Sequence, residues 1–386
     1  MKGTVERGRT TTEDKEQVEW LRHSEKNRAE NVMIVDMIRN DLGRIARFGS
    51  VHVPSLLEVE RYPTLLQMTS TVEARSDAPL DAILAALFPC ASITGAPKVR
   101  TMQLIARLEG GPRGVYTGAI GFLAPGRRAR FNVAIRTVLV DRSAGQASYG
   151  VGSGIVWDSD ADAEYAECRL KAQVLGRRFP DFDLLETMRW TAADGVARRE
   201  RHLARLAGSA EYFGFAVDLG AVRSRLADLD LVELPDPGRL RLLAGRREEL
   251  RLEVYPLELP TAPGPVRLGL AREAVDADDV FLYHKTTHRV VYEQALAGRS
   301  DCDDVLLWNQ RGELTETTTA NVILSLDNRL VTPPVASGLL AGVLRAELLE
   351  IGAVQEQVLR VDDLARCQAI YLVNSLRGWR EAIWID

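Results

Sequence analysis

Two glutamates and a lysine share one short stretch near the middle of the chain, AEYAECRLKAQV at residues 163–174. Glu164 and Glu167 are three residues apart, and Lys171 follows Glu167 by four, so a helix would bring these side chains together. Two carboxylates on one helical turn suit a divalent cation or an acid–base pair. The alternative is a solvated helix face.

Two cations stand out elsewhere. Lys285 has histidines at 284 and 288 and two threonines directly after it, a pattern that alone is typical of a surface lysine. Arg136 is the lone cation in VAIRTVLV, the apolar part of the strand-like run ARFNVAIRTVLV. We expect it either to have a buried partner or to bind an anion, because an unpaired buried charge is costly.

The elements that would position these residues alternate between helix and strand. Residues 11–45 are predicted to form a helix, with apolar residues at helical spacing from Ile34 to Ile45; two strand-like runs follow, and helices are predicted over 80–89 and 97–109. Three β-like runs lead to the helix that carries Glu164, and Pro180 ends its helical period. The second half predicts a strand at 182–190, a helix at 198–215, a β-meander and a helix with Gly342 at its start, where first-turn amides could hold a phosphate.

Composition limits the class of protein. At 386 residues, with 46% hydrophobic and 27% charged residues, the chain is typical of a soluble protein of two domains. A net charge of −5 gives no reason to expect nucleic acid or a membrane as partner. The four cysteines are far apart, and no secretory signal is evident, so we expect a cytoplasmic protein.

Six motifs in the first half resemble the chorismate-utilising enzymes: KGTVERG, AENVMIVDMIRNDLGR, SITGAPK, VYTGAIGF, AIRTV and GVGSGIVWDSD…AEYAECRLKA. The resemblance implies that Glu30 and Glu167 hold Mg²⁺ on the carboxylate of chorismate, with Glu164 close by. It also implies substrate contacts from further positions: Thr94, Tyr116, Arg136, Gly152 and Lys171.

Within this group, Lys2 resembles the lysine of aminodeoxychorismate synthase that attacks the ring before ammonia displaces it. Gln67 stands where pyruvate-eliminating relatives have histidine, and an amination that keeps the enolpyruvyl group does not need that acid–base group. The alternative for Lys2 is a disordered residue near the terminus.

Members of this family have a long stretch before Lys-Gly-Thr, whereas the chain starts at that motif. We therefore expect a domain truncated at its N-terminus, with impaired synthase activity. A misplaced start, a truncated gene or a partner that supplies the remainder would each account for this.

The second half resembles the class IV pyridoxal-phosphate enzymes, most closely aminodeoxychorismate lyase, in HLARL, HKTTHR, ETTTAN, LAGVLR and LVNSLRGW. The resemblance makes Lys285 the lysine that binds the cofactor covalently and moves protons, and Glu316 the partner of the pyridine nitrogen. Arg205 and the amides of Val343 and Leu344 would hold the phosphate. This half looks compact, so segments of the substrate pocket between Asp218 and Arg239 are expected to be missing.

Together the halves predict a mixed α+β chain: a partial chorismate-binding α/β sandwich at 1–178 and a class IV fold at 179–386. The implied function is para-aminobenzoate formation, by amination of chorismate and elimination of pyruvate from aminodeoxychorismate. The implied partners are a glutamine amidotransferase subunit that supplies ammonia and a second copy through the lyase domain. The alternative is an aminotransferase with a non-catalytic chorismate-binding domain that acts as a scaffold.

Overall fold

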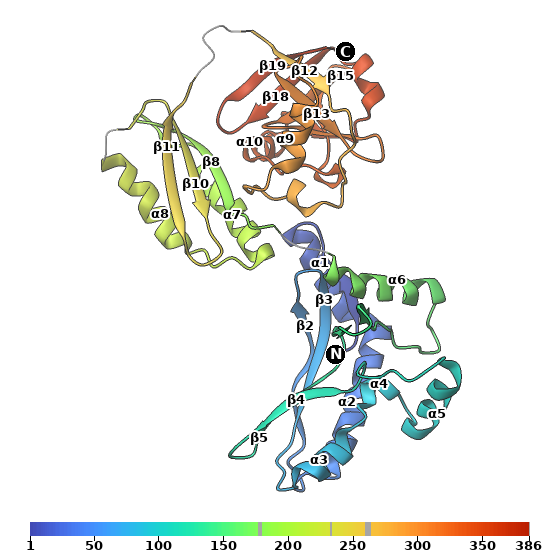
Figure 1. Cartoon of the computed structure of the whole chain (residues 1–386). Helices are drawn as coiled ribbons and strands as arrows, with labels where there is room; N and C mark the ends of the chain where they lie inside the picture. Colours follow the sequence, from blue (N-terminus) through green and yellow to red (C-terminus); the bar gives the residue numbers. More distant parts are fainter. Residues whose placement is uncertain (177–179, 232–233, 259–263, 386) are drawn as a thin grey trace. The chain divides into compact units, whose positions relative to one another are not determined.

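The computed structural model of the chain describes residues 1–176, 180–231, 234–258 and 264–385. These residues form two compact units (Figure 1). The first unit comprises Met1–Gly8 and Glu13–Phe179, and the second comprises Arg9–Thr12 and Pro180–Asp386. The boundary predicted between 178 and 179 lies outside the described residues.

A three-stranded antiparallel sheet in the order β1-β3-β2 is central to the first unit (Figure 1). Leu66 and Met68 on β3 are fully buried and pack with Val18 and Leu21 of the first helix, which explains the apolar period of that helix. The elements are β1 (Thr4–Glu6), β2 (His52–Arg61), β3 (Leu65–Glu73) and α1 (Thr11–His23).

The prediction of one continuous helix over 11–45 is wrong. The helix breaks at Ser24, whose extended backbone and side-chain oxygen cap a second helix, α2 (Glu25–Gly43). The Ser24 hydroxyl accepts a hydrogen bond from the backbone N–H of Asn27, as serine does at an N-cap. This cap sets the direction of α2, on which Glu30 lies.

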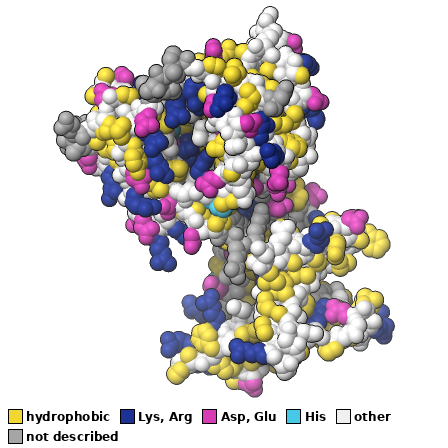
Figure 2. All heavy atoms as spheres, turned by 45° about the horizontal axis from the view of Figure 1, so that its top comes forward, with side chains coloured by type: hydrophobic (Ala, Val, Ile, Leu, Met, Phe, Trp, Pro, Cys, Tyr) yellow, Lys and Arg dark blue, Asp and Glu magenta, His cyan; other side chains and the backbone are white. Residues whose placement is uncertain are grey.

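The rest of the first unit is less buried. Two antiparallel hairpins, β4–β5 and β6–β7, are exposed along nearly their whole length, and Figure 2 shows hydrophobic side chains at the surface of this unit. Phe122, Leu123 and Val140 are among the exposed side chains. The remaining elements are α3 (Leu80–Leu87), α4 (Ala91–Thr94), α5 (Lys98–Leu108), β4 (Ala119–Ala124), β5 (Arg128–Val133), β6 (Val138–Asp141), β7 (Gln146–Tyr149), α6 (Ala161–Ala172) and η1 (Gln173–Leu175).

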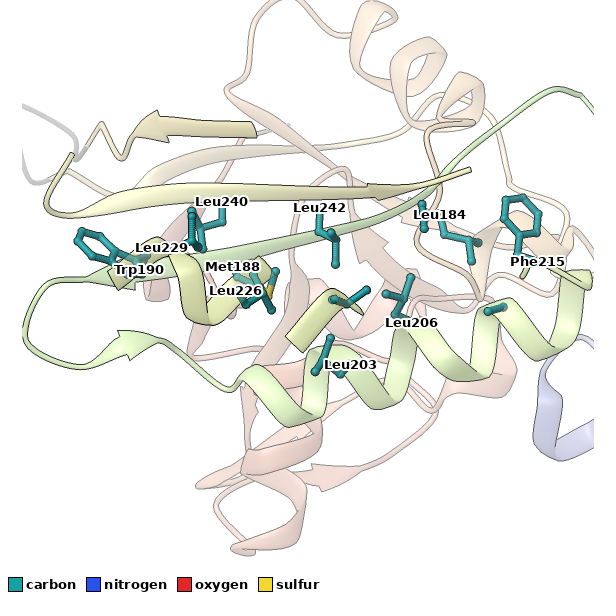
Figure 3. Close-up of a cluster of buried hydrophobic side chains, with 13 residues drawn as sticks. Leu184, Met188, Trp190, Leu203, Leu206, Phe215, Leu226, Leu229, Leu240 and Leu242 are labelled. Atoms are coloured by element: carbon teal, nitrogen blue, oxygen red, sulfur yellow. The ribbon is translucent and has the colours of Figure 1, made fainter. Parts of the chain in front are cut away.

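The second unit has two lobes. In the first lobe, the sheet β11-β10-β8-β9 packs its apolar face on helices α7 and α8, and Figure 3 shows the side chains between them. Met188, Leu203 and Leu240 are fully buried there. The elements are β8 (Leu184–Thr191), β9 (Gly195–Val196), α7 (Arg199–Phe213), α8 (Leu219–Ala227), η2 (Asp228–Leu231), β10 (Gly238–Ala244) and β11 (Leu250–Pro256).

The second lobe is built on an eight-stranded sheet in the order β14-β13-β12-β19-β18-β15-β16-β17. Its core includes Leu268, Leu306 and Leu324, all fully buried. The elements are β12 (Val266–Leu270), η3 (Val280–Leu282), α9 (Val290–Ala297), β13 (Asp304–Trp308), β14 (Leu314–Thr317), β15 (Asn321–Leu326), β16 (Arg329–Thr332), η4 (Val335–Ser337), α10 (Val343–Glu350), β17 (Gln355–Glu356), η5 (Val361–Ala365), β18 (Ala369–Asn374) and β19 (Gly378–Trp384).

Helices and strands occur in both units, so the prediction of a mixed fold is confirmed. Within the described residues, no single helix is both long and apolar enough to cross a membrane. A pair of helices, Leu80–Thr94 and Lys98–Leu108, would meet the length and composition only when taken together, across a bend of 59°.

Candidate active sites

Lys285 lies between η3 and α9, and its backbone is fixed to strand β8. The backbone N–H of Leu185 donates to the carbonyl of Lys285 at 2.9 Å, and that of Thr287 donates to the carbonyl of Asp183 at 2.9 Å. Leu184 forms a β-bridge with Thr286 in the same region. The first lobe of the second unit therefore sets the position of this lysine.

The environment of Lys285 favours its neutral amine. Burial lowers the pKa of Lys285 to about 8, and the positive charges of Arg205 and Arg289 contribute in the same direction. Glu186 and Glu316 oppose this shift without cancelling it. The side chain is partly buried, so the interpretation as a surface lysine is wrong. An amine with this pKa can act as a nucleophile or a base near neutral pH.

Glu316 is buried on β14 and is surrounded by hydrogen-bond donors. Its Oε1 accepts bonds from the Tyr292 hydroxyl at 2.8 Å and from the backbone N–H of Leu340 at 3.1 Å, and its Oε2 accepts from Asn321 Nδ2 at 3.2 Å. Burial raises the pKa of Glu316 to about 7, although the Leu340 and Tyr292 bonds act against the rise. This carboxyl can share a proton with a basic ring nitrogen.

Arg205, on α7, forms a two-bond ion pair with the fully buried Glu186 of β8. Arg205 Nε lies 2.8 Å from Glu186 Oε1, and Nη2 lies 2.6 Å from Oε2. His202, one turn before Arg205, has its Nδ1 2.7 Å from Glu186 Oε2 and its Nε2 2.8 Å from the Ser375 hydroxyl. Burial alone would raise the pKa of Glu186, but Arg205 and His202 outweigh it and lower the value to about 2.

Sequence reasoning found Arg205 and missed the residues that hold it. His202 stands in the same HLARL motif, three residues before Arg205, and this helical spacing was a usable signal. Ser375 lies in the motif LVNSLRGW, but that motif alone does not pair it with His202, and Glu186 lies in none of the motifs, because only the fold brings β8 and the β18–β19 turn to α7. Tyr292 was missed for the same reason, whereas Asn321 ends the motif ETTTAN that starts at Glu316, and this motif was a usable signal.

The start of α10 lies beside Arg205, whose Nη1 donates to the carbonyl of Ala341 at 3.3 Å. Gly342 caps this helix, and Val343 and Leu344 open it with buried side chains. A Cβ at Gly342 would lie 1.9 Å from Asn321 Oδ1, so a larger residue here would displace the Asn321 amide that bonds Glu316. The first-turn N–H groups of a helix have no partner within the helix and suit an anion.

These groups fit pyridoxal phosphate by their chemistry. The amine of Lys285, the buried carboxyl of Glu316, and the cation of Arg205 next to the start of α10 match the aldehyde, ring nitrogen and phosphate of that cofactor. Tyr292, on the helix that follows Lys285, bonds Glu316, and the charges of Lys285 and Glu316 each act on the pKa of the other group.

In the first unit, Lys2 and Glu30 are in direct contact. Lys2 Nζ donates to Glu30 Oε1 at 2.6 Å, and the backbone N–H of Lys2 donates to the carbonyl of Met68 at 3.0 Å. The ammonium group is mostly buried, with 16% of the side chain exposed. The interpretation of Lys2 as a disordered residue is therefore wrong for this structure.

Glu164 and Glu167 also form ion pairs with lysine side chains. Glu164 is buried, so a solvated helix face is wrong for this residue; its Oε1 accepts from Lys26 Nζ at 3.1 Å and from Ser159 Oγ at 2.7 Å. Burial opposes the bonds from Ser159 and Lys26, yet these bonds lower the pKa of Glu164. Glu167 Oε1 accepts from Lys171 Nζ at 2.5 Å.

These carboxylates have the oxygen donors that Mg²⁺ prefers, but not its geometry. Among residues 1–176 and the other described parts, no three His, Cys, Asp or Glu side chains group as a metal site. In this arrangement the predicted ligands Glu30, Glu164 and Glu167 are bonded to ammonium groups, so they do not fit a metal ion as they stand.

Arg136 differs from its prediction. It is exposed and lies in a bend between β5 and β6, with a left-handed φ of 50°, rather than buried within a strand. Its Nη2 donates to Gln67 Oε1 at 3.2 Å, and Gln67 Nε2 donates to the carbonyl of Gly3 at 2.6 Å. Gln67 thereby links Arg136 to the backbone next to Lys2.

The other predicted substrate residues are placed by local packing. A Cβ on Gly150 would clash with the Tyr116 ring, and a Cβ on Gly152 would lie 2.9 Å from the Tyr116 hydroxyl. Lys171 Nζ donates to the carbonyl of Gly152 at 3.0 Å, so Tyr116, Gly152 and Lys171 are neighbours. Thr94 is buried at the end of α4, where its hydroxyl lies 3.4 Å from the Cys90 carbonyl oxygen.

Residues 1–177 match the family model of the chorismate binding enzymes, and residues 183–383 match that of the class IV amino-transferases. Aminodeoxychorismate synthase from Streptomyces pristinaespiralis is 49% identical over 175 residues, 45% of this chain and 24% of that protein. Aminodeoxychorismate synthase component 1 from Bacillus subtilis (strain 168) is 44% identical over 177 residues, 45% of this chain and 37% of that protein. The chain thus spans well under half the length of these curated relatives.

A solved structure from Mesorhizobium loti, described as an amino-acid aminotransferase, matches with a TM-score of 0.50 and 40% identity. The matched region covers 53% of this chain and 100% of the Mesorhizobium loti chain. The predicted order, a chorismate-binding half followed by a class IV half, is confirmed. The chain belongs to the class IV aminotransferase family.

Proposed function

We propose that this chain serves para-aminobenzoate formation, with aminodeoxychorismate synthase chemistry in the first unit and aminodeoxychorismate lyase chemistry in the second. The observation that supports it most is the fusion itself: a stretch similar to aminodeoxychorismate synthases precedes a class IV site that holds a lysine of lowered pKa. A lyase consumes the product of the synthase, so the two halves have a chemical reason to be joined.

In the lyase half, Lys285 is the catalytic lysine. Pyridoxal phosphate supplies an electron sink that stabilises negative charge at the amine-bearing carbon of the substrate. The neutral amine of Lys285 removes the proton from that carbon, the C–O bond to the enolpyruvyl group breaks, and the ring becomes aromatic. Aromatisation makes this elimination favourable. Pyruvate forms when the released enol is protonated.

The surrounding residues hold the parts in place. Glu316 keeps a proton on the ring nitrogen of the cofactor, and its three donors fix the direction of the carboxyl. Arg205 with the backbone amides of Val343 and Leu344 binds the phosphate, and the pair with Glu186 sets the orientation of the guanidinium.

In the synthase half, the proposal assigns Lys2 as the nucleophile and Glu30, Glu167 and the nearby Glu164 as the Mg²⁺ site. The residues proposed to contact chorismate are Thr94, Tyr116, Arg136, Gly152 and Lys171. Ammonia would come from a glutamine amidotransferase subunit. We also propose the domain limits 1–178 and 179–386, a homodimer through the lyase domain and a cytoplasmic location.

The first test is the cofactor lysine. Purified protein reduced with borohydride in the presence of pyridoxal phosphate should yield one labelled peptide, with the label on Lys285. Label on a different lysine contradicts the assignment. In the second test, the protein given aminodeoxychorismate should release pyruvate and para-aminobenzoate.

A second candidate function is amino-acid transamination, with the first unit as a scaffold, because the matched Mesorhizobium loti structure is described as an aminotransferase. An assay that supplies an amino acid and 2-oxoglutarate distinguishes transamination from lyase activity. Keto-acid formation without pyruvate release from aminodeoxychorismate supports transamination. A scaffold should also show no Mg²⁺-dependent binding of chorismate.

A further inference from the structure

Three acidic side chains proposed as metal ligands each have a lysine of their own. Lys2 pairs with Glu30 at 2.6 Å, and Lys171 pairs with Glu167 at 2.5 Å. The third pair, Lys26 with Glu164 at 3.1 Å, is further held by the Ser159 hydroxyl. The carboxylates are therefore charge-balanced with no cation bound.

The Lys2–Glu30 and Lys171–Glu167 pairs both lie next to the glycine-rich segment GVGSG at 150–154. The carbonyl of Gly152 accepts a bond from Lys171 Nζ at 3.0 Å. Two residues further on, a Cβ at Gly154 would lie 2.4 Å from Glu30 Oε1 and 2.5 Å from Lys2 Nζ. Alternate residues of an extended chain are about 7 Å apart, so both ion pairs lie within one small site.

A divalent cation at this site would compete with the ammonium groups. Mg²⁺ demands oxygen ligands at short distance and loses its water reluctantly, so it displaces a bound ammonium poorly. An ammonium at 2.6 Å from a mostly buried carboxylate, with 16% and 10% of the two side chains exposed, is screened little by solvent. The ion pairs therefore disfavour the binding of a divalent cation to these carboxylates in the absence of substrate.

We propose that Lys2 and Lys171 are built-in counter-ions that keep Glu30 and Glu167 closed to a divalent cation until a dianionic substrate draws the two ammonium groups away. This rests on the proposed function for the substrate and the cation. With substrate bound, its carboxylate would pair with Lys171 and Lys2 would turn from Glu30 toward the substrate, which would leave oxygens of Glu30 and Glu167 to hold the cation. Cation and substrate then bind together, and each raises the affinity for the other.

The experiment measures Mn²⁺ binding to the full chain by the loss of the free-ion signal in electron paramagnetic resonance, without substrate. Lys2→Met and Lys171→Met should each bind Mn²⁺ more tightly than wild type, and the double variant at least about tenfold more tightly. Lys171→Arg keeps the positive charge and should stay at the wild-type affinity. Lys98→Met removes a lysine that pairs with Asp41 at 3.6 Å and is the matched control.

If neither Met variant gains affinity over wild type and Lys98→Met, the counter-ion proposal is wrong. Equal gains in Lys171→Met and Lys171→Arg also overturn it, because charge would then not be the cause. Adding chorismate tests the proposed function separately. Wild type that binds Mn²⁺ only with chorismate supports that function, even if the Met variants show no gain, whereas absence of binding in every protein contradicts both proposals.

Discussion

The hydroxyl of Tyr292 donates a hydrogen bond of 2.8 Å to Oε1 of Glu316, which joins helix α9 to strand β14 inside the second unit. Both groups are buried, so water does not replace this bond if it is lost. The pair determines how easily Glu316 stays ionised, and it gives Tyr292 a role in the cofactor site that the sequence did not predict.

Tyr292→Phe should weaken the binding of pyridoxal phosphate. Loss of the donor raises the pKa of Glu316 above its present value of about 7, so more of the carboxyl is protonated at neutral pH and bonds the ring nitrogen less well. A hydrogen bond to a charged group contributes about 2 kcal/mol, which corresponds to roughly a thirtyfold change in Kd. Titration of the apoprotein with the cofactor, followed by fluorescence, measures it.

Tyr371→Phe, which removes a hydroxyl from β18, is the control for this measurement. The loss of cofactor affinity in Tyr292→Phe should become smaller as the pH is raised above 7, since Glu316 then ionises again. An affinity unchanged at every pH would show that Tyr292 does not act through Glu316.

Glu186→Gln should destabilise the second unit by about 3 kcal/mol at pH 7, because it leaves the mostly buried guanidinium of Arg205 without its carboxylate. The pKa of Glu186 is lowered from 4.5 to about 2, so its contribution is present above pH 4.5 and is lost as the pH falls toward 2. Urea unfolding at several pH values tests this. The difference between wild type and variant should narrow across that window, and a constant difference would contradict it.

Part of this site could be predicted from the sequence. Lys285, Glu316 and Arg205 lie in local motifs whose residue types carry the chemistry, and the structure links them through shared charge effects. Glu186 reaches the site from a strand outside these motifs, and the contact of Ser375 with His202 depends on the fold, although Ser375 itself lies in LVNSLRGW. Arg136 was misread because an apolar stretch with one cation resembles a strand, whereas β5 ends at Val133 and Arg136 has a left-handed backbone in the bend before β6. The helix over 11–45 was predicted without its break, because residues 11–42 include no proline or glycine that would mark one, and the break is the cap at Ser24.

Lys285→Met should stabilise the apoprotein at pH 7. Burial lowers the pKa of Lys285 from 10.5 to about 8, so the folded state binds a proton less readily than the unfolded state. Wild-type stability therefore rises as the pH increases from 8 to 10.5, and below pH 8 the buried charge costs at most about 3 kcal/mol. Thermal melts of the apoprotein at pH 7 and pH 11 should show the advantage of the variant shrinking. Lys285→Gln removes the same charge without adding an apolar group and should show the same pH trend. If the melting temperatures of wild type and both variants change with pH in parallel, the pKa of Lys285 is not lowered.

Gly154→Ala should impair chorismate binding while leaving the first unit folded. The new methyl group would lie 2.4 Å from Glu30 Oε1 and 2.5 Å from Lys2 Nζ, both at the far ends of flexible side chains that can move aside. We expect a melting temperature within a few degrees of wild type and at least a tenfold weaker chorismate affinity in calorimetry with Mg²⁺ present, about 1.4 kcal/mol. Gly111→Ala, where a Cβ meets nothing within 4 Å, is the control. Wild-type affinity in Gly154→Ala would show that Lys2 and Glu30 do not form the substrate site.

The bond from the Leu185 N–H to the Lys285 carbonyl has a consequence for protein engineering. The lysine belongs by sequence to the segment that leads into α9, yet its backbone is held by a strand of the other lobe. Neither lobe expressed by itself would hold the lysine in its register against β8, so a split version of this enzyme divided between the lobes would regain the site only after the two fragments reassemble. A sensor of fragment association could use that property, with covalent labelling of Lys285 as its signal.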